Sequence, residues 1–122
     1  MEKVINIGDK EVKFRATAGV LSRYRTYFNR DFLKDLMELT KKLEKLKSPE
    51  EQMESINLEV FEKIAWTMAK TADSTIPPID EWLDNFDTFG IIKILPELVE
   101  LMVSNMSQQN ESKKKLEEVA GN

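Results

Sequence analysis

Apolar side chains recur at every second position in two short runs near the N-terminus. This alternation is typical of half-buried β-strands and predicts a hairpin over Val4–Arg15, with its turn in the polar segment Gly8–Glu11. A two-stranded hairpin has little stability alone, so it has to pack against the rest of the chain. The side chains that share its apolar face are Ile5, Ile7, Val12 and Phe14.

The pattern leaves two registers for this hairpin. A turn centred on Asp9 and Lys10 pairs Ile7 with Val12, whereas a turn centred on Gly8 and Asp9 pairs Ile7 with Lys10. We predict the first register, because it sets apolar residues opposite each other and because the register of a strand fixes which side chains reach the core.

After the hairpin, apolar residues recur at spacings of three and four, the pattern of amphipathic helices. Thr17 and Asp87 are predicted N-caps, and Asn29 is a predicted left-handed C-cap. Ser48 begins a further helix, and the pattern leaves open whether it continues through Asn57 or whether a new helix starts there. The predicted helices cover Ala18–Phe28, Asp31–Lys47, a segment from Ser48, Leu58–Ala72, Pro78–Leu83 and Thr88–Ser107.

The sequence therefore predicts a mainly α (α+β) fold, in which an N-terminal β-hairpin packs on a bundle of about five helices. One domain covers residues 1–103 in this interpretation, and the polar remainder, 104–122, forms a flexible tail. Leu58–Ala72 is apolar over more than half of its helical surface, which is typical of a helix at the centre of a core. Pro96 has no amide N–H, so it should kink or divide the last helix.

Two apolar helical surfaces are candidates for interaction. In the first, the helix that begins near Asp31 has an apolar seam at alternating spacings of four and three, widened by Leu33 and Met37. Either this seam packs in the core of its own domain, or it joins two copies of the chain. The seam residues that we assign to self-association are Phe32, Leu36, Leu39, Leu43 and Leu46.

The second candidate is the segment Phe89–Val103, which is apolar on more than one face of a helix. Either the core buries all of these side chains, or some of them form a surface that binds a helical partner. The four residues that we assign to partner binding are Ile92, Leu95, Val99 and Met102.

Composition argues against an enzyme. The chain of 122 residues has no cysteine and no histidine, which excludes thiol nucleophiles, disulfides, histidine triads and histidine-ligated zinc. We expect no catalytic residue, no cofactor and no metal. The densest acidic group is attributed to helix-start electrostatics rather than to metal binding, and it comprises Asp80, Glu81, Asp84 and Asp87.

Charge and hydropathy argue against nucleic acid and membrane partners. The 18 basic and 22 acidic residues give a net charge of −4, whereas nucleic-acid binders are usually basic. The N-terminus lacks the apolar run of a signal peptide, and Phe89–Val103 is shorter than the roughly 20 residues that span a bilayer. We therefore expect a cytoplasmic protein. The nearest basic cluster has aromatic residues interleaved and carboxylates diluting it, and it comprises Arg23, Arg25, Arg30 and Lys34.

Several segments together resemble the tail assembly chaperones of long-tailed phages and prophages of Gram-positive bacteria. They are a hairpin like Ile5–Phe14, a Tyr- and Arg-rich helix like Ala18–Phe28, a break and acidic-apolar restart like Asn29–Phe32, a helix like Leu58–Ala72, and a Pro and Asp-Glu-Trp-Leu element like Pro78–Leu83. Their order and the length match from Val4 to about Val103. The break often carries Gly where this chain has Asn29, which also tolerates left-handed backbone.

The resemblance implies a non-catalytic protein that binds the tape measure protein; a contact with the major tail protein is left open. Such a protein keeps its client soluble in the host bacterial cytoplasm while tail tube subunits assemble around it. It acts in many copies, as a homo-oligomer, and is absent from the mature virion. A small cytoplasmic helical adaptor or regulator, unrelated to virus assembly, is the alternative that the sequence leaves open.

The resemblance also implies a longer form made by ribosomal frameshifting. Consecutive Lys113, Lys114 and Lys115 can be encoded by a run of adenines on which a ribosome slips. We expect an overlapping reading frame that begins before the stop codon and continues well past it. If both alternative frames close within a few codons, this expectation is wrong and the segment is only a solvated tail.

Overall fold

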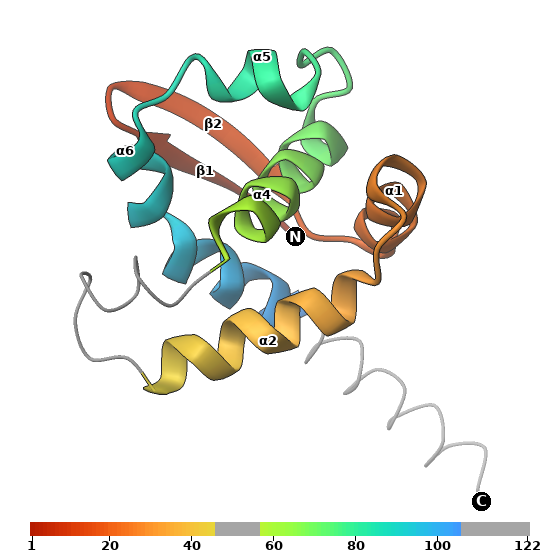
Figure 1. The fold of residues 1–122 in the computed structure, drawn as a ribbon. Coiled ribbons are helices and arrows are strands. Elements are labelled where there is room, and N and C mark those ends of the chain that lie inside the picture. Colours follow the sequence, from red (N-terminus) through yellow and green to blue (C-terminus); the bar gives the residue numbers. More distant parts are fainter. Residues whose placement is uncertain (46–56, 106–122) are drawn as a thin grey trace, which may run out of the picture.

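The computed structural model describes residues 1–45 and 57–105, and it has the mainly helical fold with an N-terminal hairpin that the sequence predicts (Figure 1). The predicted helix start at Ser48 and the tail residues 106–122, with Lys113–Lys115, lie outside the described residues. The elements, in chain order, are β1 (Glu2–Ile7), β2 (Lys10–Arg15), α1 (Ala18–Phe28), α2 (Phe32–Lys45), α4 (Leu58–Ala72), α5 (Ile79–Leu83), α6 (Thr88–Lys93) and a helical stretch over 95–105.

The hairpin has the register that we did not predict. Its strands pair antiparallel with Ile7 opposite Lys10 rather than Val12, so its turn consists of Gly8 and Asp9. Moving a turn by one residue shifts the pairing by two and leaves every side chain on the same face, so the apolar pattern could not choose between the registers. The turn itself decides, because Gly8 has φ +64°, and a two-residue turn with positive φ at its first central position favours glycine there.

The apolar face of the hairpin nevertheless lies on the core, as predicted. Three of its four predicted core residues are buried, and the fourth, Val12, is partly buried against the same cluster. Lys10 does not enter the core from its place on this face. Its Nζ donates a hydrogen bond to the Asn85 carbonyl oxygen at 2.8 Å and lies over the Phe86 ring.

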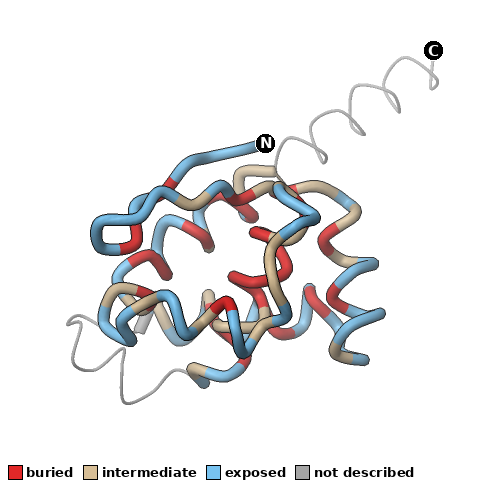
Figure 2. The backbone as a smooth tube through the Cα atoms, turned by 90° about the horizontal axis from the view of Figure 1, so that it is seen from above, coloured by how far each residue is buried: buried red, intermediate tan, exposed pale blue. Residues whose placement is uncertain are grey.

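The helix α4 lies at the centre of the molecule. The hairpin covers one side of it, α1 and α2 pack beside it, and α6 lies on the side away from α1 (Figure 1). Nine of its fifteen residues are buried. Seen from above in Figure 2, the buried positions of the chain lie mostly on the inward sides of the backbone. This central place is the one predicted from an apolar surface wider than one helical face.

Helix boundaries follow local sequence closely. Asn29 adopts a left-handed conformation (φ 54°, ψ 42°) and ends α1 as predicted. Asn57 accepts a hydrogen bond from the Val60 N–H at 3.3 Å, so α4 begins there. Thr17 and Asp87 precede α1 and α6 as predicted, but neither side chain makes a capping hydrogen bond.

The last apolar segment is divided, as its proline predicts. The helix α6 ends at Lys93, Ile94 lies in a turn, and helical residues resume at 95. Pro96 lies in the first turn of this second stretch, where its missing N–H costs no helical hydrogen bond. The Leu98 N–H then bonds the Ile94 carbonyl oxygen at 3.0 Å.

Candidate interaction surface

The seam assigned to self-association lies mostly inside the chain's own core. Phe32, Leu36 and Leu39 are only 2, 2 and 3% exposed. Leu43 is partly buried against the same cluster, and Leu46 lies outside the described residues. This burial supports the core interpretation of the seam, since its first three residues have almost no surface to offer a second copy. Self-association itself stays a prediction.

The surface assigned to partner binding is also largely internal. Leu95 and Met102 are 1% and 0% exposed, which makes them core residues rather than surface residues. Ile92 and Val99 are half-buried, and Val99 packs against the core. The physical reason is the break at Ile94, because two short helical segments can turn more than one apolar face toward the same core.

Two exposed apolar side chains lie together on a different face. Leu33 and Met37 are 37% and 56% exposed, and residues four apart on a helix are neighbours on one face. We call them the α2 outer pair. Exposed Lys34, Glu38 and Lys41 surround them along the helix. Leu33 and Met37, which widen the predicted seam, therefore form an apolar surface on α2.

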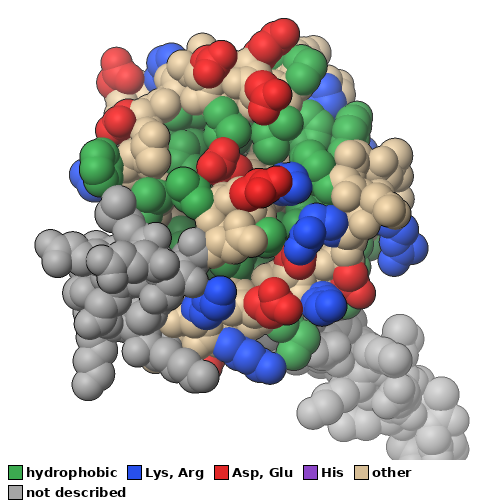
Figure 3. Space-filling view, in the orientation of Figure 1, with side chains coloured by type: hydrophobic (Ala, Val, Ile, Leu, Met, Phe, Trp, Pro, Cys, Tyr) green, Lys and Arg blue, Asp and Glu red, His purple; other side chains and the backbone are tan. Residues whose placement is uncertain are grey.

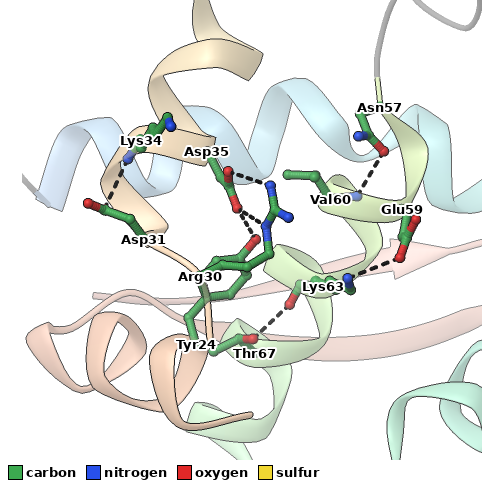
Figure 4. A network of polar contacts seen from close by, with 10 residues as sticks. All are labelled: Tyr24, Arg30, Asp31, Lys34, Asp35, Asn57, Glu59, Val60, Lys63 and Thr67. Atoms are coloured by element: carbon green, nitrogen blue, oxygen red, sulfur yellow. Dashed lines mark hydrogen bonds and ion pairs between the residues drawn. The ribbon is translucent and has the colours of Figure 1, made fainter. Parts of the chain in front are cut away.

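A buried carboxylate ties α2 to α1 (Figure 4). Asp35 is 3% exposed, and its oxygens accept hydrogen bonds from Tyr24 Oη at 2.5 Å and from Arg30 Nε and Nη2 at 2.7 and 3.1 Å. The left-handed residue Asn29 turns the chain just before Arg30. The network therefore links α1, the turn and α2 into one unit.

The pKa values of these groups shift in directions that agree with this geometry. The hydrogen bonds from Arg30 lower the pKa of Asp35, in spite of its burial, and the bond from Tyr24 adds to the lowering. Burial raises the pKa of Tyr24, and the neighbouring Asp35 carboxylate raises it further. Asp35 is therefore ionised and Tyr24 neutral at pH 7.

This network is not among the features predicted above, although the sequence contains a signal for it. Asp35 lies three residues after Phe32 and four before Leu39, on the buried stripe of α2, and a buried carboxylate needs a charged or hydrogen-bonding partner. Arg30 is that partner. One of the four residues of the basic cluster is therefore committed to structure.

The aromatic residues near the basic cluster serve packing. Tyr27 and Phe28 contact Trp66 edge to face, with ring centroids 4.9 and 5.7 Å away. Lys63 and Lys70 lie over the rings of Phe28 and Trp66. Since Trp66 is only 3% exposed, its contacts with these rings join α1 to α4, and Tyr27 keeps 53% of its surface exposed.

Three of the four residues of the predicted acidic group lie at helix starts, whereas Asp84 lies at the end of α5. Asp80 and Glu81 lie in the first turn of α5, where negative charge complements the helix dipole. Within residues 1–45 and 57–105, no three acidic side chains come together in a way that could hold a metal ion. No helix in the same ranges is long and apolar enough to cross a bilayer.

The chain was compared with models of protein families, with curated proteins and with solved structures, and none of them matches it. The assignment of a candidate interaction surface therefore rests on geometry. The α2 outer pair is apolar and exposed, and it lies on a helix of 14 residues.

Proposed function

We propose that this chain is a non-catalytic phage tail assembly chaperone, which binds the tape measure protein and keeps it soluble during tail assembly. The observation that carries the proposal is the order of the elements: a hairpin, a Tyr- and Arg-rich helix with a left-handed end, and then helices in the order typical of that family. It would act in the host bacterial cytoplasm, in several copies, and be absent from the virion.

The α2 outer pair is our candidate for the surface that meets the client. A long helical client exposes apolar stripes before assembly, and such a stripe can lie along Leu33 and Met37. Methionine suits this role because its flexible side chain adapts to different partners. A surface of two side chains binds weakly, so many copies along one long client would supply the overall affinity.

A small helical adaptor or regulator is the competing function. Both functions use an apolar surface and no catalytic residue, so the fold alone does not separate them. Gene neighbours do, because a chaperone of this class should lie between a gene for a major tail protein and a gene for a very long helical protein. A gene without such neighbours would favour the adaptor.

Co-expression tests the proposal directly. The long helical protein encoded downstream should enter the insoluble fraction when it is expressed alone, and should become soluble and co-purify when this chain is expressed with it. An unrelated small acidic helical protein at the same level is the control. If the client is equally soluble with the control protein, the chain is not its chaperone.

A further inference from the structure

Among the described residues no third strand pairs with the hairpin, so the outer edge of β2 is unpaired, as is that of β1. The Met1 ammonium donates to the Ala16 carbonyl oxygen at 3.2 Å, and the Ala16 N–H donates to the Met1 carbonyl oxygen at 2.8 Å. Because hydrogen-bonded and non-hydrogen-bonded pairs alternate in an antiparallel ladder, the pairs between these ends follow from the register. The N–H and C=O groups of Glu11 and Lys13 therefore point away from β1, along the outer edge of β2.

A cavity of about 430 Å³ lies along this edge. Its walls come from β2, from the end of α4 with the loop after it, and from α5, which runs beside β2 in Figure 1. Figure 3, in the orientation of Figure 1, shows apolar side chains gathered in the upper half of the molecule, with acidic ones above them. The apolar residues that line the cavity are Val12, Ala69, Ala72, Ile76 and Trp82.

Side chains fasten the two ends of this cavity and leave its middle open. At one end, Arg15 Nη1 donates to the Thr71 carbonyl oxygen at 3.4 Å. At the other end, Lys10 Nζ donates to the Asn85 carbonyl oxygen, just after α5. The edge of β2 and the helices are thus connected on both sides of the open residues, so the slot between them exists before any ligand arrives.

We propose that this slot binds an extended, basic segment of a partner polypeptide, which adds to β2 as a third strand. The outward backbone groups of Glu11 and Lys13 would exchange hydrogen bonds with the segment, as in other cases of strand addition. Side chains alternate along a strand, so every second residue of the segment would enter the apolar cavity. This inference does not depend on the proposed chaperone function.

The charges around the slot favour a basic segment. Glu11 and Asp73 line it together with Lys13. Lys10 and Arg15 stand at its two ends, and Arg15 is paired with Glu2. Hydrogen bonds from Thr75 hold the pKa of Asp73 below its usual value, so this carboxylate is ionised at pH 7. Further exposed carboxylates stand on α5 and just after it. Lys or Arg at the outward positions of the segment would complement this charge.

The first test is hydrogen exchange with a defined peptide. The probe is an acetylated and amidated peptide of sequence Lys-Val-Glu-Val-Lys-Val-Lys, which in antiparallel orientation sets Glu opposite Lys13 and Lys opposite Glu11. We expect the amides of Glu11 and Lys13 to become protected as the peptide is added. Protection of Val4 and Asn6, the outward amides of β1, or of neither edge would overturn the proposal. So would protection of Glu11 and Lys13 that depends only on the concentration of the chain itself, because a second copy would then be the occupant.

Matched proline variants test the same edge from the side of the protein. Lys13→Pro removes an outward N–H from β2, and Val4→Pro, at the position opposite, removes one from β1; proline is tolerated at such edge positions. We expect Lys13→Pro to weaken peptide binding about tenfold or more, and Val4→Pro to leave it unchanged. Equal binding by the two variants would contradict strand addition.

If circular dichroism shows that either proline variant does not fold, N-methylated peptides make the same comparison with the unchanged protein. Methylation of the third and fifth peptide nitrogens, which face β2, should abolish binding, and methylation of the fourth, which faces away, should not. Equal binding by these two peptides would show that charge alone holds the probe, and would overturn the proposal.

Discussion

The helices α4 and α2 both carry many apolar residues, but they hide them to different degrees. The helix α4 has neighbours on several sides and buries nine of its fifteen residues. The helix α2 lies at an edge of the molecule, buries one stripe and leaves Leu33 and Met37 exposed. The number of neighbours, rather than apolar content, decides which side chains stay on the surface. A binding surface is therefore to be sought on a helix that is covered on one side.

The largest expected effect is on the stability of the fold, at a residue that the sequence assigned to a binding surface and that the core buries. Met102→Ser should lower the free energy of unfolding by about 3 kcal/mol or more, because it removes a fully buried side chain and buries a hydroxyl. Ile92→Ser, at a half-buried position of the same segment, should cost about 1 kcal/mol. Urea unfolding measures both. Equal and small effects would indicate that Met102 lies at the surface, and would weaken the contrast between buried helices and helices at the edge of the molecule.

The next effect concerns the network that holds α2 in place. Asp35→Ala should lower the free energy of unfolding by about 1–3 kcal/mol, because the buried Tyr24 hydroxyl loses its acceptor. Glu38→Ala, an exposed change on the same helix, should stay within about 0.5 kcal/mol of the unchanged chain. If both variants unfold at the same urea concentration, the network does not stabilise the fold.

A smaller effect follows from the lowered pKa of Asp35. A carboxyl group whose pKa is lower in the folded chain adds stability above its unfolded pKa of about 3.9, and this stability is lost as the pH falls through the lower folded value. The difference in unfolding free energy between the unchanged chain and Asp35→Asn should therefore shrink between pH 7 and pH 3. A difference that is the same at both pH values would show that the charge of Asp35 adds no stability.

The sequence predicted the secondary-structure elements better than the contacts that cover their apolar faces. Alternation and helical spacing located the hairpin and the central α4, and Pro96 predicted the division of the last apolar segment, because these features depend on neighbours in the chain. The prediction of the hairpin register was wrong because both registers put the same side chains on the same face. The position of Gly8, which has a positive φ, was the signal that decides between them.

The interaction surfaces could not be predicted in the same way. Spacing identifies an apolar face but not what covers it, so Leu95 and Met102 looked available although the core covers them. The Asp35 network was within reach, since a carboxylate on an apolar stripe requires a partner, but its partner Arg30 is contributed by a turn whose shape depends on Asn29.

The most direct test of the account compares two double variants of α2 in the co-expression experiment. Leu33→Ser with Met37→Ser removes the α2 outer pair, and Lys34→Ser with Lys41→Ser changes two exposed neighbours on the same helix. Because all four positions are exposed, each substitution should change the unfolding free energy by less than about 1 kcal/mol. The account predicts that the client becomes insoluble only with the first double variant. A client that stays soluble with both double variants would contradict the claim that the exposed face of this edge helix is the binding surface.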